Sequence, residues 1–461
     1  MNFTSVTFLF YFLPVFIALY YAVKNQNYKN YLILAASLFF YAWGEGYYLL
    51  LLMGSVIGNH FLAQIIHTID RKKRWLAIAI TANLGLLLAL KYGGFIGQSL
   101  GLVSPDTHHA HLPLGISFFT FQAISMLIDV YRGQTPMKSL THTGIYITMF
   151  PQLIAGPIVR FNSLKDQIIK RDETVERFAS GVKIFILGLA QKVLIANVLA
   201  GPVDVAFSAP TDSLSLTAAW VGIICFSFQI YYDFAGYSNM AIGIGRMIGF
   251  ELPQNFNYPY SAKSFQEFWR RWHMTLSRWF RDYLYIPLGG SRQGRVKTYR
   301  NLLIVFILCG FWHGAAWTFL LWGLWHGAFL ILERKLPPSI GQALHAPIIG
   351  SAYMFFGVTF GWVLFRATSL GQAWGYWKAL LGLNSSAAIN PAQLGFLPLT
   401  QITLGAAILI AWQGWETRLA LRLSPSYITR LMQWGALYGL LILSMIYVAG
   451  TTHQPFIYFR F

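Results

Sequence analysis

Long apolar stretches separated by short basic connectors dominate the chain. Runs such as YLILAASLFFYAW, YYLLLLMGSVIG and WLAIAITANLGLLLAL recur along its length. A helix needs about 20 apolar residues to cross the hydrocarbon core of a bilayer, and it satisfies its own backbone hydrogen bonds there. The pattern therefore predicts an all-α, polytopic integral membrane protein with roughly 10–12 membrane helices.

The basic residues lie mainly in the connectors, at Lys24 and Lys29 and within residues 71–74, 292–300 and 334–335. The positive-inside rule places these connectors in the cytoplasm and the N-terminus outside. The formal net charge of +18 then has lipid headgroups as its expected counter-charge, not nucleic acid. No cleavable signal pattern, soluble domain or linker is visible, so residues 1–461 are predicted to form a single membrane domain.

Two segments depart from simple spans. ITMFPQLIAGPIVRF, residues 147–161, contains two prolines and a glycine and is predicted to be broken or re-entrant. Residues 264–283 fit one amphipathic helix at the membrane interface, with aromatic residues on one face and arginines on the other. His273 falls near the border of that apolar face, beside Ser277. It could face headgroups or look inward from a cavity, and periodicity leaves both open.

The tetrapeptide WHGA occurs twice in LCGFWHGAAWTFLLWGLWHGAFL, residues 308–330, which places His313 and His326 thirteen residues apart. The nearly uncharged residues 301–332 would form a straight helix of about 48 Å, too long for a ~30 Å core. One long kinked helix or two short half-helices would fit. The basic flanks favour half-helices, with a break at Gly310 or Gly314.

On a continuous helix the two histidines would point to nearly opposite sides, ~20 Å apart. They are therefore predicted not to act as one pair unless the backbone breaks between them. His313 lies near mid-membrane, where an ionisable side chain is by default a functional candidate. The alternative is a neutral core histidine hydrogen-bonded to a backbone carbonyl.

Other polar residues in the chain are weaker candidates for a functional site. Asp233 has Arg246 thirteen residues on and Ser238 nearby, which favours an ion pair or helix packing over a place in a site. The loop sequence HHAH, residues 108–111, could bind a metal, but nearby histidines in a polar loop rarely do, and we predict no metal site.

Five segments carry a family resemblance: PLGISFFTFQAISMLIDVYRG, MFPQLIAGPIVRF, YYDFAGYSNMAIGIGRMIGF, NFNYPYSAKSFQEFWRRWHMTLSRWFRDYLYIPLGGSR and GFWHGAAWTFLLWGLWHG. In this order they resemble the membrane-bound O-acyltransferase superfamily, most closely its alginate O-acetyltransferase branch. The resemblance covers essentially the whole chain, with a core at about residues 113–330 and flanks at 1–112 and 331–461. It implies helices and re-entrant half-helices around a central funnel or tunnel in the bacterial inner membrane, where the charge pattern predicts a periplasmic N-terminus.

The resemblance also implies an activity. An acetyl group would pass from a cytoplasmic thioester, acetyl-CoA or an acyl carrier, towards a hydroxyl of an alginate-like exopolysaccharide across the inner membrane, with no other cofactor bound. His313 matches the superfamily's invariant histidine, His273 its second polar residue, and His326 a less general third histidine. We hypothesise that His313 is the general base and that His273 polarises the carbonyl or orients the donor.

Further residues follow from that chemistry. A thioester is already activated, so no covalent nucleophile is needed, and Cys225 and Cys309 are predicted to be inert. Tryptophans would shape a water-poor tunnel and arginines would attract the donor's phosphates. The supporting candidates are His326, Asp233, Trp312 and Ser277, and the donor-binding candidates are Arg270, Arg271, Arg278, Arg281 and Arg292.

Partners and rival functions complete the prediction. The resemblance implies a periplasmic acetyltransferase partner and the exopolysaccharide synthesis and secretion machinery, so the immediate acceptor is either the sugar or a serine of that partner. The alternatives are a D-alanyl transfer protein of the same superfamily acting on cell-wall polymers, a transporter, and a non-catalytic anchor of a secretion complex. A transporter would be expected to show repeated halves, and the short WHGA copy is the one internal repeat visible.

Overall fold

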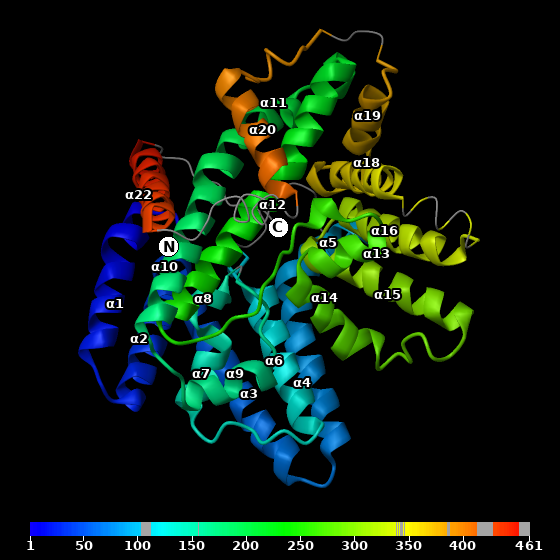
Figure 1. Cartoon of the computed structure of the whole chain (residues 1–461). Helices are drawn as coiled ribbons and strands as arrows, with labels where there is room; N and C mark the ends of the chain where they lie inside the picture. Colours follow the sequence, from blue (N-terminus) through cyan, green and yellow to red (C-terminus); the bar gives the residue numbers. More distant parts are fainter. Residues whose placement is uncertain are drawn as a thin grey trace. The chain divides into compact units, whose positions relative to one another are not determined.

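The structure, a computed structural model, describes residues 1–102, 112–154, 156–337, 346–384, 388–412 and 427–450, with 339, 341 and 344. Within these ranges the regular structure is helical, and β-pairing is limited to an isolated bridge between Leu214 and Ile389 (Figure 1). The predicted all-α class is confirmed. The HHAH sequence at 108–111 lies outside the described residues.

The membrane prediction is also confirmed. Six helices in the described ranges are long and apolar enough to cross a bilayer: Tyr48–Thr68, Lys72–Ser99, Val175–Ser208, Leu216–Met247, Pro347–Arg366 and Leu431–Gly450. Three shorter apolar helices are Thr7–Ala22, Ile116–Tyr131 and Pro398–Ala411. The chain is a multi-pass membrane protein, and the number of 10–12 spans stays a prediction.

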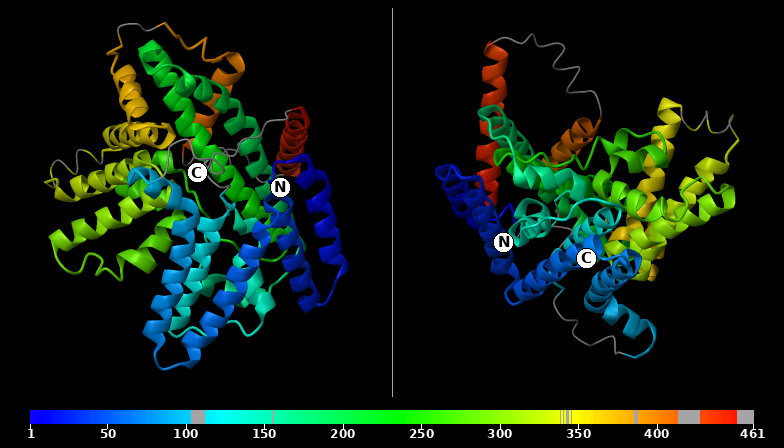
Figure 2. Two further views of the ribbon diagram at one scale, coloured as in Figure 1. Left: turned by 180° about the vertical axis from the view of Figure 1, so that it is seen from behind. Right: turned by 90° about the horizontal axis from the view of Figure 1, so that it is seen from below.

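The chain divides into two compact units. The first comprises Met1–Ile186 and Tyr237–Gln254, and in it α3 (Tyr48–Thr68), α4 (Lys72–Leu87) and α6 (Ile116–Tyr131) pack against one another (Figures 1 and 2). Helix α7 (Leu140–Thr148) ends at Met149 and is followed by the four-residue α8 (Phe150–Leu153). Pro151 occupies the first turn of α8 and Pro157 lies in the non-helical chain beyond, which confirms the predicted break.

The second unit comprises Leu187–Gly236 and Asn255–Phe461 and contains a tight helical hairpin. Helices α15 (Arg295–His313) and α16 (Trp317–Lys335) lie side by side in both figures and meet at Gly310 and Gly323. The chain reverses through extended backbone at Gly314 and Ala316. The prediction of two helices is confirmed, but each has 19 residues and is not a half-helix. Gly310 marks the helix crossing, and Gly314 makes the break.

The prediction of one amphipathic helix over residues 264–283 was wrong. The segment forms α13 (Phe265–Arg271), α14 (Met274–Phe280) and the π-helical η6 (Arg281–Tyr285). His273 interrupts it with a left-handed φ of 40°. The backbone of residues 255–257 stabilises this interruption through two hydrogen bonds. The Asn257 N–H donates to Arg271 O, and the Met274 N–H donates to Asn255 O. Helical periodicity cannot reveal that long-range partner.

Candidate active site

Three histidines from the second unit gather around tryptophan side chains. The ring of His313 lies 5.0 Å from that of Trp322, and the ring of His326 lies 4.9 Å from the same indole. His273 lies 6.1 Å from Trp312, which in turn lies 4.9 Å from His313. All three histidines are at most 4% exposed. The ~20 Å separation expected on a continuous helix does not apply, because the chain breaks and reverses between the two WHGA histidines.

Hydrogen bonds assign the protons of the two WHGA histidines. His313 Nδ1 lies 2.7 Å from Cys309 O, and a carbonyl oxygen can only accept, so Nδ1 donates and Nε2 carries a lone pair. His326 is the opposite tautomer. The Trp269 indole N–H donates to its Nδ1 at 3.3 Å, so the proton of the neutral ring must reside on Nε2. The hydrogen bond to a backbone carbonyl that is expected of a structural histidine is thus present at His313, and it leaves the lone pair of the neutral ring on Nε2.

His273 is held by Asn255. The Thr275 backbone N–H donates to Asn255 Oδ1 at 3.3 Å, which identifies that atom as the oxygen. His273 Nδ1 lies 3.1 Å from the same oxygen and must therefore be a donor, so its Nε2 also carries a lone pair. That Nε2 is buried and has no hydrogen-bond partner among the described residues. His273 therefore faces inward, which resolves the choice that periodicity left open.

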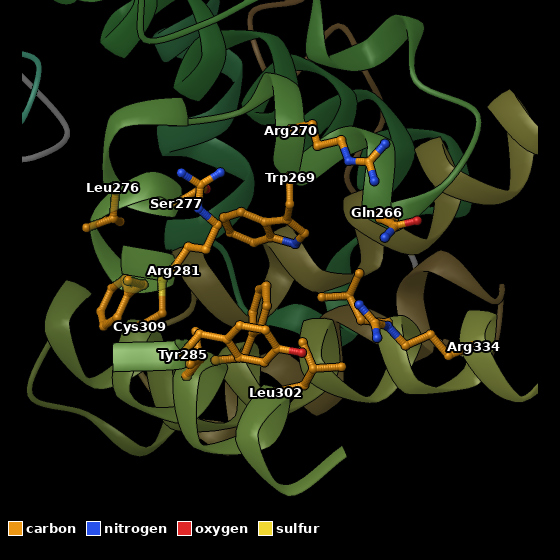
Figure 3. A pocket seen from close by; sticks show the side chains of 14 residues that line it. Gln266, Trp269, Arg270, Leu276, Ser277, Arg281, Tyr285, Leu302, Cys309 and Arg334 are labelled. Atoms are coloured by element: carbon orange, nitrogen blue, oxygen red, sulfur yellow. The ribbon is translucent and has the colours of Figure 1, made fainter. Parts of the chain in front are cut away.

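A cavity of about 190 Å³ lies beside this cluster. Its walls are mostly apolar, and Arg270, Arg281 and Arg334 surround Trp269 in the close view (Figure 3). Trp269 and Cys309 both line the cavity and are the hydrogen-bond partners of His326 and His313. The cavity thus connects three guanidinium groups with the residues that contact the two WHGA histidines. The full lining is Gln266, Trp269, Arg270, Leu276, Ser277, Phe280, Arg281, Tyr285, Leu302, Val305, Phe306, Cys309, Leu330 and Arg334.

The predicted donor-binding residues divide into two groups. Arg270, Arg281 and the supporting candidate Ser277 line the cavity, whereas Arg278 and the exposed Arg292 do not. Arg271 instead forms an ion pair with Glu267 at 2.8 Å. Burial acts to raise the pKa of Glu267, but hydrogen bonds from the Lys263 backbone amide and the Arg271 guanidinium hold that pKa below its ordinary value. Arg271 therefore stabilises α13 and does not face the cavity.

Sequence reasoning missed two residues of α16. It assigned Arg334 only to the cytoplasmic charge pattern, yet Arg334 lines the cavity. Its neighbour Glu333 accepts hydrogen bonds from the backbone N–H groups of Phe265 at 2.5 Å and Gln266 at 3.1 Å. A carboxylate at a helix N-terminus is favourable, so Glu333 fixes the start of α13 to α16. The nearness of both residues to the second WHGA copy was the one available signal.

Asp233 forms the predicted kind of interaction with a different partner. On α12 (Leu216–Met247) it pairs with Lys192 of η3 (Gln191–Ala196), and both side chains are 2% exposed. Arg246, the partner suggested by sequence, bonds Glu251 instead. The neighbouring Phe234 packs edge-on against His273 at 4.6 Å. Asp233 therefore forms a buried ion pair next in sequence to a residue that packs on His273.

Buried histidines beside a cavity in a multi-pass membrane protein are candidate catalytic groups, and the comparisons with known proteins define the class of the protein. The model of the membrane-bound O-acyltransferase family matches residues 144–338. The chain belongs to this family and is an O-acyltransferase, as the motif resemblance predicted.

Its relatives give a more particular picture. A probable alginate O-acetylase of Pseudomonas putida is 37% identical over the whole of both chains. The corresponding protein of Pseudomonas aeruginosa is 41% identical over 89% of this chain and 81% of its own. A peptidoglycan O-acetyltransferase of Helicobacter pylori is 40% identical over 83% of this chain and 80% of its own.

Proposed function

We propose that this enzyme moves an acetyl group from a thioester donor to a hydroxyl of an exopolysaccharide, with His313 as the general base. The hydrogen bond from His313 Nδ1 to Cys309 O carries the proposal, because it puts the proton of the neutral ring on Nδ1 and the lone pair on the buried Nε2, and because Cys309 lines the cavity. Nε2 would take the hydroxyl proton while the hydroxyl oxygen attacks the thioester carbon. The C–S bond then breaks, and the leaving thiolate takes the proton back from the imidazolium.

The cavity supports a thioester donor with a phosphate-bearing arm. Its volume of about 190 Å³ is below the ~300–1,000 Å³ typical of a pocket that encloses a whole ligand. We therefore place only the acyl arm inside, with the phosphates of coenzyme A or of a carrier's prosthetic group at Arg270, Arg281 and Arg334. The apolar walls would exclude water and so limit hydrolysis of the thioester. No further cofactor is needed for this chemistry.

The hydrogen bond to Asn255 favours one of the two roles considered for His273. An Nε2 without a proton cannot donate to the thioester carbonyl, but it can accept a hydrogen bond from an amide or hydroxyl group. We therefore propose that His273 orients a bound reactant. Its left-handed backbone, which costs about 1–3 kcal/mol in a residue other than glycine, supports a functional role for this position.

We propose an inner-membrane location with a periplasmic N-terminus, as the basic connectors indicate. A periplasmic acetyltransferase and the exopolysaccharide secretion machinery would then complete the reaction, with the sugar or a serine of that partner as the immediate acceptor. The names of the relatives, which refer to alginate and peptidoglycan, support a polysaccharide as the final acceptor.

Complementation of a deletion strain tests the proposal. The variant His313→Gln should lower polysaccharide acetylation by at least ~100-fold, the range expected for loss of a general base. His60→Gln is the matched control, since His60 is also buried but bonds Thr143 in the first unit. Full acetylation by His313→Gln would overturn the assignment.

Proteoliposomes with radiolabelled acetyl-CoA and de-acetylated polysaccharide separate the rival functions. Acetyl transfer to polysaccharide supports the proposal. A requirement for a D-alanyl carrier thioester would favour the teichoic-acid type of reaction. Movement of a solute without acetyl transfer would favour a transporter. The absence of both acetyl transfer and solute movement would favour a non-catalytic anchor.

A further inference from the structure

The second WHGA histidine contacts the wall of the cavity and is not itself among the lining residues. Trp269, on α13, lines the cavity, and its indole N–H donates to His326 Nδ1 at 3.3 Å. The two rings meet edge to face at 5.2 Å. We infer that His326 is a positioning residue for the acyl donor and acts by fixing the indole of Trp269. This inference rests on the proposed function in one respect, that the cavity takes the donor.

The other ring nitrogen of His326 points away from the cavity. A Cβ atom built on Gly361 of α18 (Pro347–Arg366) would lie only 3.2 Å from His326 Nε2. That Nε2 is buried and has no hydrogen-bond partner among the described residues. The single proton of the neutral ring is on Nε2 and faces the backbone of α18. Nε2 therefore cannot act as a base, and it cannot donate a hydrogen bond to the thioester.

Aromatic packing fixes the orientation of the His326 ring. Trp322 lies 4.9 Å away, Phe265 lies 5.6 Å away, and Phe268 is stacked on it at 6.3 Å. With the ring so confined, Nδ1 remains directed at Trp269. The hydrogen bond to Nδ1 then favours one direction of the Trp269 indole edge, because an indole N–H buried in an apolar wall is stabilised by an acceptor. Rotation of Trp269 would change the width of the donor cavity.

Two amide substitutions at His326 test the roles of its two ring nitrogens separately. An Asn side chain places its oxygen near the position of Nδ1, whereas a Gln side chain reaches the position of Nε2. His326→Asn should keep the KM for acetyl-CoA within about twofold, because the acceptor for Trp269 remains, while His326→Leu and His326→Gln should raise it about 5–10-fold with a smaller change in kcat. Trp269→Phe should match His326→Leu, and the double variant should be no worse than either.

Alkylation of Cys309 gives a readout that needs no donor. Cys309 lines the cavity and is 4% exposed, and Cys225, the other cysteine, can be replaced by serine. His326→Leu and His326→Gln should accelerate N-ethylmaleimide labelling of Cys309 several-fold in the absence of acetyl-CoA, and His326→Asn should not.

The inference is overturned if Gln restores the native KM and labelling rate and Asn does not, or if the effects of the His326 and Trp269 variants multiply. Failure of the wild-type protein to use acetyl-CoA would contradict the proposed donor, and the labelling rates would still test the role of His326.

Discussion

Replacing Gly323 by alanine tests whether the α15–α16 crossing sets the geometry of the site. An added Cβ would strike the carbonyl of Phe306, 2.9 Å from its carbon, and would lie 3.3 Å from Gly310 Cα. Ordinary contact begins near 3.4 Å, so the helices must separate by at least 0.5 Å to clear this carbon and by more to clear the carbonyl oxygen, which lies nearer, since backbone atoms cannot rotate away. Overpacking of this kind costs about 1–3 kcal/mol. Because a misplacement of about 1 Å can cost 10²-fold in rate, we expect roughly a tenfold loss of acetyl transfer.

The assay combines thermal unfolding in detergent with initial rates of acetyl transfer from labelled acetyl-CoA. Gly405→Ala is the matched control, since Gly405 lies in the apolar helix α20 (Pro398–Ala411) with no neighbouring atom within 4 Å of the added Cβ. That control should be neutral or stabilising by up to about 1 kcal/mol. If Gly323→Ala matched Gly405→Ala in both measurements, the crossing would not determine the positions of His313 and His326.

Three further substitutions test separate parts of the site. Arg334 lines the cavity, so Arg334→Gln should raise the KM for acetyl-CoA several-fold in rate assays. Arg292→Gln removes the same charge away from the cavity and should leave the KM unchanged. Equal effects of the two variants would mean that only the overall charge matters. Asn255→Ala should lower kcat about tenfold or more, because His273 loses its acceptor, whereas Asn255→Asp should largely restore kcat; a native kcat for the Ala variant would contradict the role of Asn255. Lys192→Met should lower the free energy of unfolding by about 3–5 kcal/mol, because the buried Asp233 carboxylate loses its ion pair with Lys192. Adding Asp233→Leu should recover part of this loss in thermal unfolding, and a single variant as stable as the native protein would contradict the role of the pair.

Features that depend on composition and local order were predictable from sequence. Long apolar runs determine the membrane class, because the bilayer imposes helix length directly. The prolines at 151 and 157 predicted the broken segment for a similarly local reason. The order of the motifs identified the family, and the positions of His313 and His273 within those motifs made them candidates.

Features that depend on long-range contacts were not predictable. Residues 264–283 have a sound amphipathic period, but the chain leaves helical geometry at His273, where Asn255 provides hydrogen bonds. The periodicity described a helix that the fold does not complete. The arginines that line the cavity could not be told apart from the others for the same reason, because charge along the chain does not distinguish Arg334, which lines the cavity, from Arg292, which is exposed.

The two WHGA copies show how one tetrapeptide acquires two geometries. His313 is the last residue of α15, and its Nδ1 bonds the carbonyl of Cys309, four residues earlier in the same helix. His326 lies inside α16 and takes its partner, Trp269, from another helix. The first arrangement leaves the lone pair on Nε2 of a buried histidine at the end of a helix, and the second directs the lone pair on Nδ1 to the indole of Trp269. Identical local sequence therefore leads to a proposed base in one copy and a proposed support for the donor cavity in the other, and the turn at Gly314 places both on the same indole of Trp322.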